Sequence, residues 1–405
     1  MKALESFDLS LNKLSGELPM SLSKLNFISI FNVSYNNFKG RVPTSTQIQS
    51  LDESNFFGNN LCGAPLTSDC VPVDVPVIVG DQEKEYGSHG ADWGLIISIV
   101  LGFITGFWIV VASLIVNKSW RIVYFRFTGN IPATIMNCSN LQVLNLGNNN
   151  LVGKIPDAIG SLPMLSILAL PSNILQGGIA PEIGRLFRLQ ELYLFNNTFT
   201  GNIPATLMNC SNLQILYLAS NNLVGKIPDG IGSLSMLRMI SLHDNSLQGR
   251  IPSEIGSLFR LQELWLYNNS FTGNIPATIT NCSNLQILEL GNNALAGKIP
   301  DGIGSLSMLR MISLHDNSLQ GGIPSEIGCL FRLQELWLYN NSFTGNIPAT
   351  ITNCSNLQIL QLGFNNLVGK IPDGIGSLSM LSILALHDNI LQGGIPNEIG
   401  RLFRL

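Results

Sequence analysis

Residues 261–276 read LQELWLYNNSFTGNIP, and close variants of this stretch recur along most of the chain. Leu264 and Leu266 flank Trp265, so in a short strand the two leucines point to one side and the tryptophan to the other. Asn269 follows the strand and can bond backbone groups of the turn after it. The closing Gly-Asn-Ile-Pro then turns the chain back, so the stretch is one strand-and-turn unit.

The unit recurs every 24 residues, as its proline shows at Pro252, Pro276 and Pro300. The step is doubled across one gap, where Ala180 takes the proline position and Pro181 follows it. Eleven such units run from Leu141 to Arg404. One unit cannot bury its apolar face alone, so neighbours must stack. The sequence predicts an α/β solenoid with short parallel strands on its concave side, and turns, 3₁₀ and short helical pieces on its convex side.

Composition supports a folded chain and argues against one class of partner. Hydrophobic residues make up 45% and charged residues 12%, which favours burial over disorder. The net charge is −4 and no basic patch stands out, so nucleic-acid binding has no electrostatic support.

Recurring histidines and cysteines do not form a predicted reactive site. His243, His315 and His387 follow one another at intervals of three repeats. At about 4.8 Å per repeat, positions three repeats apart are separated by roughly 14 Å. Histidines at this distance cannot share a metal ion, and cysteines at this distance cannot form a disulfide. The same holds for the cysteines in Asn-Cys-Ser, which we interpret as small buried residues: Cys138, Cys210, Cys282 and Cys354. We therefore expect no enzyme, no catalytic residue, no metal and no cofactor.

A longer period lies over the repeats. Residues 205–276 and 277–348 differ at nine of 72 positions, which indicates duplication of a three-repeat block. Recurrence of a residue type is therefore weak evidence for function, because the residue was copied with its block.

The consensus Leu-x-x-Leu-x-Leu-x-x-Asn-x-Leu-x-Gly-x-Ile-Pro resembles the plant-specific leucine-rich-repeat class. That class includes receptor-like kinases, receptor-like proteins and polygalacturonase-inhibiting proteins. The resemblance covers residues 127–405 and 1–43. It implies a binding protein of plant defence or signalling, and a glycoprotein. Sequons of the Asn-x-Ser/Thr type fit this expectation: Asn137, Asn196, Asn209, Asn268, Asn281, Asn340 and Asn353.

The N-terminal third resembles the end of a receptor-like protein. Two more repeats lead into residues 44–70, which resemble the C-terminal cap of such arrays. The resemblance implies a disulfide between Cys62 and Cys70 and hence an oxidising compartment, with two free thiols as the alternative. Residues 71–93 are acidic and are interpreted as a solvated juxtamembrane linker.

Residues 94–116 contain no charge and, at about 1.5 Å per residue, would span roughly 34 Å as a helix. The basic residues of segment 117–127 favour the cytoplasm, so the helix is predicted to cross once with its N-terminal side outside. Gly102 and Gly106 form a small-xxx-small pattern that allows close approach of a second helix. The resemblance to receptor-like proteins implies that the second helix belongs to an adaptor receptor-like kinase.

The predicted order is repeats over 1–43, cap over 44–70, acidic linker over 71–93, transmembrane helix over 94–116, basic tail over 117–127 and the main array over 128–405. Residues 1–8 lack the apolar region of a signal peptide. A single crossing would put an array of ectodomain type in the cytoplasm, so its side of the membrane stays open. The array has neither a paired-cysteine cap before it nor a kinase sequence after it, and a composite of two gene fragments is one hypothesis.

Aromatic residues alternate with the inward leucines and are predicted to project from the concave face. Exposed aromatics favour binding of a peptide or protein, whereas the alternative is that they only pack on neighbouring strands. Glu191, Glu263 and Glu335 precede the aromatic pairs and are expected to add polar contacts. The candidate ligand-binding residues are Tyr193, Phe195, Tyr217, Trp265, Tyr267, Trp337 and Tyr339.

The leading prediction is a membrane-anchored receptor-like protein at the plasma membrane. It would recognise a peptide or protein and signal through a partner kinase, having no kinase of its own. The alternatives are a binding protein of the polygalacturonase-inhibitor type and a non-functional composite of a receptor-like-protein tail with a truncated receptor-kinase ectodomain.

Overall fold

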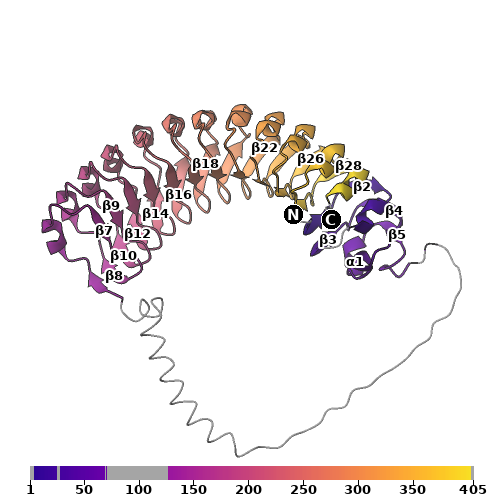
Figure 1. Cartoon of the computed structure of the whole chain (residues 1–405), viewed down its shortest axis with the longest axis horizontal. Helices are drawn as coiled ribbons and strands as arrows, with labels where there is room; N and C mark the ends of the chain where they lie inside the picture. Colours follow the sequence, from indigo (N-terminus) through magenta and orange to yellow (C-terminus); the bar gives the residue numbers. More distant parts are fainter. Residues whose placement is uncertain (1–3, 25–27, 69, 71–125, 403–405) are drawn as a thin grey trace, which may run out of the picture.

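The computed structural model describes residues 4–24, 28–68, 70 and 126–402. Each repeat unit folds into a short strand, a second short strand and a 3₁₀ turn. In one unit these are β17 (Glu263–Trp265), β18 (Ser270–Asn274) and η9 (Ala277–Asn281). The units stack into an arc with the 3₁₀ turns along its outer rim (Figure 1).

The strands form two parallel sheets, one of thirteen strands and one of fifteen. The thirteen-stranded sheet contains the strands with the alternating leucines, and its outward-pointing side is called the concave face below. Its strands are β1 (Ser6–Asp8), β3 (Ile30–Asn32), β7 (Val143–Asn145), β9 (Ile167–Ala169), β11 (Glu191–Tyr193), β13 (Ile215–Tyr217), β15 (Met239–Ser241), β17, β19 (Ile287–Glu289), β21 (Met311–Ser313), β23 (Glu335–Trp337), β25 (Ile359–Gln361) and β27 (Ile383–Ala385).

In each unit, the strand of the second sheet begins a few residues after the strand of the first sheet ends. Its strands are β2 (Lys13–Gly16), β4 (Asn37–Arg41), β5 (Asn60–Cys62), β6 (Thr128–Asn130), β8 (Asn150–Gly153), β10 (Ile174–Gly177), β12 (Thr198–Gly201), β14 (Asn222–Gly225), β16 (Ser246–Arg250), β18, β20 (Ala294–Gly297), β22 (Ser318–Gly322), β24 (Ser342–Asn346), β26 (Asn366–Gly369) and β28 (Ile390–Gly393).

The convex elements are 3₁₀ turns, one of the forms predicted for this side. They are η1 (Met20–Lys24), η2 (Glu53–Phe56), η3 (Ala133–Asn137), η4 (Asp157–Ser161), η5 (Pro181–Arg185), η6 (Ala205–Asn209), η7 (Asp229–Ser233), η8 (Ser253–Ser257), η9, η10 (Asp301–Ser305), η11 (Ser325–Cys329), η12 (Ala349–Asn353), η13 (Asp373–Ser377) and η14 (Asn397–Arg401). Over the ranges that the structure describes, the only α-helix is α1 (Thr46–Gln49), in the cap. After two strands and their turns, each unit has too few residues left on this side for a stable α-helix.

The convex turns also stack closely, which explains a glycine within them. A Cβ atom placed on Gly232 would lie 2.8 Å from the carbonyl oxygen of Glu254 in the next turn. A side chain at this position would therefore push neighbouring turns apart.

The inward leucines form one continuous core because the strands are aligned in register. Leu264 of β17 lies beside Ile240 on one side and Leu288 on the other, and all three side chains are buried. Phe199, Phe271 and Phe343 fill equivalent places in the second sheet and are fully buried. The core therefore runs the whole length of the solenoid, as the repeat predicts.

The asparagines at the end of each motif bond backbone groups of the turn, as predicted, and together they form a ladder along the stack. The Asn221 side-chain amide donates to the carbonyl oxygens of Leu194, Leu218 and Ala219 at 3.0–3.1 Å, and its oxygen accepts from the Phe199 N–H at 3.0 Å. Two of these partners, Leu194 and Phe199, belong to the preceding unit. One buried side chain thus ties its own turn to the turn of its neighbour.

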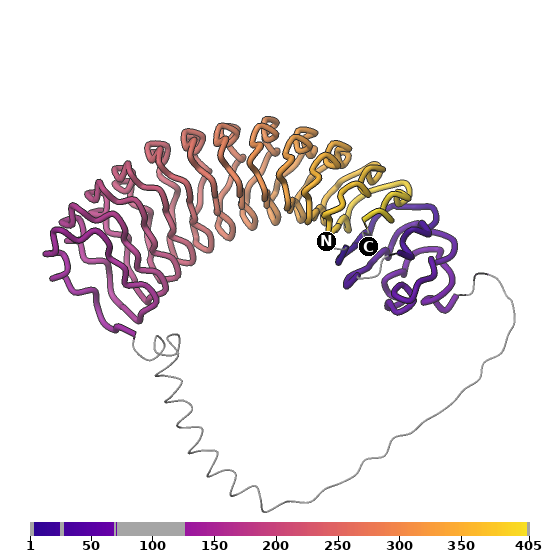
Figure 2. The backbone as a smooth tube through the Cα atoms, viewed as in Figure 1, coloured from indigo at the N-terminus to yellow at the C-terminus, as the bar shows by residue number. Residues whose placement is uncertain are grey.

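The order of the repeats in space differs from their order in the chain. β1 pairs in parallel with β27, and β2 pairs with β28, so the N-terminal repeats continue the solenoid beyond the C-terminal end of the main array. The tube of Figure 2 shows the indigo repeats lying against the yellow ones. Residues 1–43 and 128–405 were expected as separate arrays, and the described parts of both form one solenoid instead.

The cap follows from this arrangement. Residues 44–68 cover the outer side of β3 and β4, where Ile48 and Phe56 are buried and β5 extends the second sheet. Cys62 and Cys70, the pair implied by the resemblance, are disulfide-bonded with Cα atoms 5.0 Å apart. The main array therefore has a cap at one end, supplied by the segment that precedes it in the chain.

In the part of the chain that the structure describes, no helix is long and apolar enough to cross a membrane. The predicted transmembrane helix over 94–116, with Gly102 and Gly106, lies outside the described residues, as does the acidic linker over 71–93.

Candidate functional site on the concave face

Register places the outward-pointing residues of the concave face in three rows. The first row holds the residue before the central leucine of each strand, among them Glu263 and Glu335. The second holds the residue after that leucine, and β15 to β23 contribute Ser241, Trp265, Glu289, Ser313 and Trp337 in succession. The third lies two residues further on, beyond the end of each strand, and contains the histidines.

One line of rings runs across four neighbouring repeats. Phe195 stacks on Tyr217 with ring centroids 4.2 Å apart, and Tyr217 lies 6.2 Å from His243. His243 in turn stacks on Tyr267 at 4.3 Å. Tyr193 and Trp265 flank this line from the second row, at 6.4 Å from Tyr217 and 6.5 Å from Tyr267 respectively.

A second, shorter group repeats the arrangement three strands further along. His315 stacks on Tyr339 with centroids 4.7 Å apart and ring planes 2° from parallel, and Trp337 lies 6.3 Å from Tyr339. All seven aromatic residues predicted from the sequence therefore lie on this face, in two groups separated by the strand β19 and its neighbour β21.

The glutamates of the first row contact the aromatic residues of their own strands. The indole N–H of Trp265 donates to Glu263 at 2.9 Å, and that of Trp337 donates to Glu335 at 3.0 Å. The hydroxyl of Tyr193 donates to Glu191 at 3.0 Å in the same way. Burial and this bond raise the pKa of Tyr193 to about 12. Each glutamate thus fixes the orientation of one partly exposed ring, in addition to the polar contacts expected of it.

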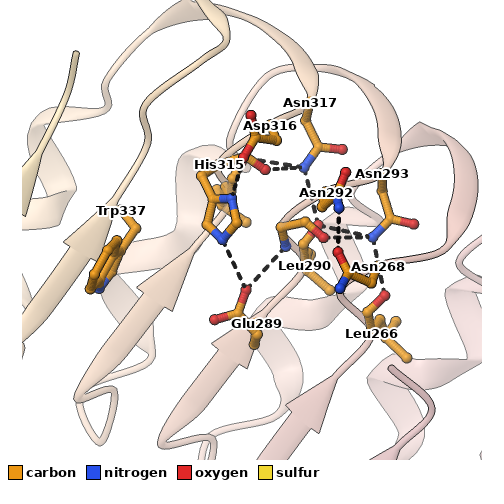
Figure 3. Close-up of polar contacts among 12 residues, drawn as sticks. Leu266, Asn268, Glu289, Leu290, Asn292, Asn293, His315, Asp316, Asn317 and Trp337 are labelled. Atoms are coloured by element: carbon orange, nitrogen blue, oxygen red, sulfur yellow. Dashed lines mark hydrogen bonds and ion pairs between the residues drawn. The ribbon is translucent and has the colours of Figure 1, made fainter. Parts of the chain in front are cut away.

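The gap between the two aromatic groups contains a buried carboxylate (Figure 3). Glu289 of β19 is only 5% exposed, and its carboxylate accepts from the Gly291 N–H at 3.2 Å and lies 3.9 Å from Nε2 of His315. A Cβ atom on Gly291 would lie 2.5 Å from that same nitrogen. The absence of a side chain at Gly291 therefore lets the imidazole lean over the glutamate.

Two opposing effects set the protonation of this carboxylate. Burial raises the pKa of Glu289, and the Ser313 hydroxyl, the Gly291 N–H and the nearby His315 ring only partly offset that rise. Nδ1 of His315 is 2.8 Å from Asp316, so the imidazole lies between two carboxylates.

We predict that Glu289→Gln stabilises the protein at neutral pH. The folded pKa of Glu289 is raised above that of an unfolded glutamate, about 4.3. Ionised Glu289 therefore disfavours folding above the folded pKa, and this penalty disappears as the pH falls from the folded to the unfolded pKa. The melting temperature of Glu289→Gln should exceed that of the parent at pH 7, and the two should converge near pH 4. Gln361 already occupies the equivalent place in β25. A difference that stays constant with pH would contradict this explanation.

The sequence pattern missed the histidines as members of this surface. His243 and His315 were considered for metal binding and catalysis, whereas the structure places each against a tyrosine ring of the next repeat. Their place on the concave face could have been predicted from their position two residues beyond the strand, because Tyr267 and Tyr339 occupy the same position.

The cysteines follow the sequence interpretation with one exception. Burial raises the pKa of Cys210, Cys282 and Cys354 to about 11 each, as expected for inert core thiols. Cys138 is exposed, so its interpretation as a buried residue is wrong. It follows η3, the first described turn of the main array, and no described turn lies before it to cover the thiol.

Comparison with known families agrees with this architecture. A leucine-rich repeat region model matches residues 197–342, and a leucine-rich repeat model matches residues 3–25, 140–162, 332–354 and 356–378. The matched range 3–25 lies in the N-terminal repeats, which the structure joins to the main array.

The chain is similar to Receptor-like protein EIX2 of Solanum lycopersicum, with 40% identity over 89 residues, 21% of this chain and 9% of that protein. It is also similar to Polygalacturonase inhibitor 2 of Arabidopsis thaliana, with 44% identity over 68 residues, 16% of this chain and 20% of that protein. Both matches span only a small part of the relatives' own length.

Among solved structures, the plant peptide hormone receptor RGFR1 in complex with RGF2 matches with a TM-score of 0.63 and 27% identity. The match covers 98% of this chain and 61% of that receptor. The repeat unit, the two parallel sheets and the family models agree: the chain is a leucine-rich-repeat protein, similar to plant receptor-like proteins and to a plant receptor ectodomain.

Proposed function

We propose that this protein binds a peptide or protein ligand on its concave face, between Tyr193 and Tyr339. The observation that carries the proposal is the line of rings from Phe195 to Tyr267, built on register-aligned strands and continued by the Trp337 group. Aromatic side chains with one partly exposed face are the residue types that anchor protein interfaces.

The rings are already oriented before a ligand arrives. Stacking between neighbouring repeats and the glutamate bonds to Trp265 and Trp337 restrict their rotamers. Restricted side chains lose less conformational entropy on binding, so a preorganised surface of this kind supports affinity. The curvature of the array would let an extended peptide contact several repeats at once.

Differences between the copied blocks support a recognition role for the same face. Tyr217, Glu289 and Gln361 are equivalent positions of three successive blocks, each beside a buried leucine. The buried leucine is unchanged, while the outward-pointing residue after it is a phenol in one block, a carboxylate in the next and an amide in the third. A surface that reads a ligand along its length needs different chemistry in different repeats.

The remaining parts of the proposal rest on the relatives. Receptor-like protein relatives support a location at the plasma membrane or outside the cell. Structural likeness to a peptide hormone receptor supports a peptide among the possible ligands. We propose that the output passes through a partner kinase, and that the protein itself is not an enzyme.

A second candidate function comes from the polygalacturonase-inhibitor relatives, one of which is 44% identical over 68 residues. Such a protein would use the same concave face to bind an enzyme that degrades the cell wall. Inhibition of a fungal polygalacturonase by the purified chain would support this candidate, and unchanged enzyme activity at saturating chain would dismiss it.

Selection from a phage-displayed random peptide library tests the leading proposal. We expect the purified chain to enrich a peptide family, and Trp265→Ala to weaken binding of the enriched peptides by at least about tenfold, which corresponds to about 1.4 kcal/mol. The matched control is Phe259→Ala, because Phe259 is 60% exposed and lies between η8 and β17, outside the concave rows. Equal loss in both variants, or peptides that ignore Trp265, would contradict a concave binding site.

A further inference from the structure

The junction between the two ends of the chain has the contacts of an internal repeat boundary. Ser6, Phe7 and Asp8 of β1 pair in register with β27, and the Leu386 N–H donates to the Asp8 carbonyl oxygen at 2.8 Å. Phe7 is fully buried and stacks on Phe31 of the next N-terminal repeat at 5.6 Å. The apolar core therefore continues across the junction without interruption.

The asparagine ladder also crosses the junction. The Asn12 side-chain amide donates to the Leu386 carbonyl oxygen at 3.0 Å, and its oxygen accepts from the Leu391 N–H at 3.1 Å. The equivalent internal bonds of Asn221 have the same pattern, at 3.1 Å and 3.0 Å. Asp8 adds a contact across the junction, with its carboxylate 3.6 Å from Nδ1 of His387.

We propose that residues 4–68 are the end cap of the main array in the same chain, and that this closure requires both parts to lie on one side of any membrane. A single crossing by residues 94–116 would separate them and leave Leu384, Leu386 and Leu391 of the last array repeat uncovered. Exposed apolar edges and unpaired strands favour aggregation, so the array needs an occupant at this edge. One chain therefore cannot both cover its main array with residues 4–68 and cross a membrane once through residues 94–116.

The occupant is the segment of the same chain rather than a partner of unknown chemistry. Its units continue the array with the same leucine, asparagine and glycine positions, and its own far end is closed by α1, η2 and β5. Burial of Leu4, Leu9 and Leu14 depends on the C-terminal repeat beside them. Each part thus supplies the apolar cover that the other lacks.

A disulfide cross-link in the full-length chain tests this proposal. Lys13 of β2 and Gln392 of β28 are register partners with exposed side chains, so Lys13→Cys/Gln392→Cys does not disturb the core. Neighbouring strands are about 4.8 Å apart, within the range for a disulfide. The matched control is Lys13→Cys/Gln176→Cys. Gln176 occupies in β10 the position that Gln392 occupies in β28, and β10 is ten strands away from the β2 strand of Lys13.

After mild oxidation, we expect a cross-linked monomer whose linked peptides contain positions 13 and 392, at least tenfold more abundant than any link in the control. The control also measures the background from the exposed native thiols of Cys138 and Cys329. A covalent dimer carrying the same peptide pair would mean that the cap comes from a second copy, and would overturn closure within one chain. Linkage no greater than in the control would overturn the junction itself.

Discussion

Phe271→Ala should lower the free energy of unfolding by about 3–5 kcal/mol, the usual loss for a fully buried phenylalanine. Phe271 is 0% exposed in β18 and lies inside the continuous core, where Phe199 and Phe343 fill equivalent places three repeats away on either side. Neighbouring repeats cannot close the resulting cavity, because their strands are held in register on both sides. Urea denaturation followed by circular dichroism would measure the change.

The matched control for this prediction is Phe259→Ala. The Phe259 side chain lies only half a repeat earlier but is 60% exposed, so its removal should change stability by no more than about 0.5 kcal/mol. If Phe259→Ala destabilised the protein as much as Phe271→Ala, the exposed phenylalanine would have a cover that the chain alone does not show.

Asn221→Ala is the second substitution with a large expected effect. It removes four hydrogen bonds at once. The Phe199 N–H and the Leu194 carbonyl oxygen, which lie in the preceding repeat, lose the Asn221 side chain as their partner. Buried groups left unsatisfied cost about 1–3 kcal/mol each, so we expect a loss of about 3 kcal/mol or more. The same denaturation experiment measures it.

Asn222→Ala controls for the loss of an asparagine in the same turn. Asn222 is exposed at the start of β14, and the equivalent residue of the next block is already Ala294. Its substitution should leave the unfolding midpoint nearly unchanged. Similar losses in Asn221→Ala and Asn222→Ala would mean that the ladder adds little to stability.

Much of this molecule could be predicted from the sequence, because the decisive contacts lie within one unit or between neighbours. The constant repeat period fixes which leucines point inward, which asparagines form the ladder and which aromatics face outward. Trp265 and Tyr267 were placed on the concave face by alternation alone, and the structure has them there. The form of the convex side was harder to predict, because both 3₁₀ turns and short helices satisfy the same Ile-Pro pattern.

The details of the candidate site depended on contacts between units. Nothing in the local pattern around His315 reveals that its ring stacks on Tyr339 and leans over Glu289, since these residues lie in the repeats on either side of it. The closeness of His315 to Glu289 requires the missing side chain of Gly291 as well as the strand register. A pattern read one unit at a time does not combine such residues.

The sequence by itself determined the repeat, the inward and outward faces and the family resemblance, because periodic burial is a local property of the chain. Only the tertiary structure decided that β1 follows β27, since any two leucine-rich edges with the same register can pair, however far apart they lie in the chain. The apolar edge at Leu384 and Leu386 is covered by the N-terminal repeats, which carry the same motif although they lie far away in the sequence.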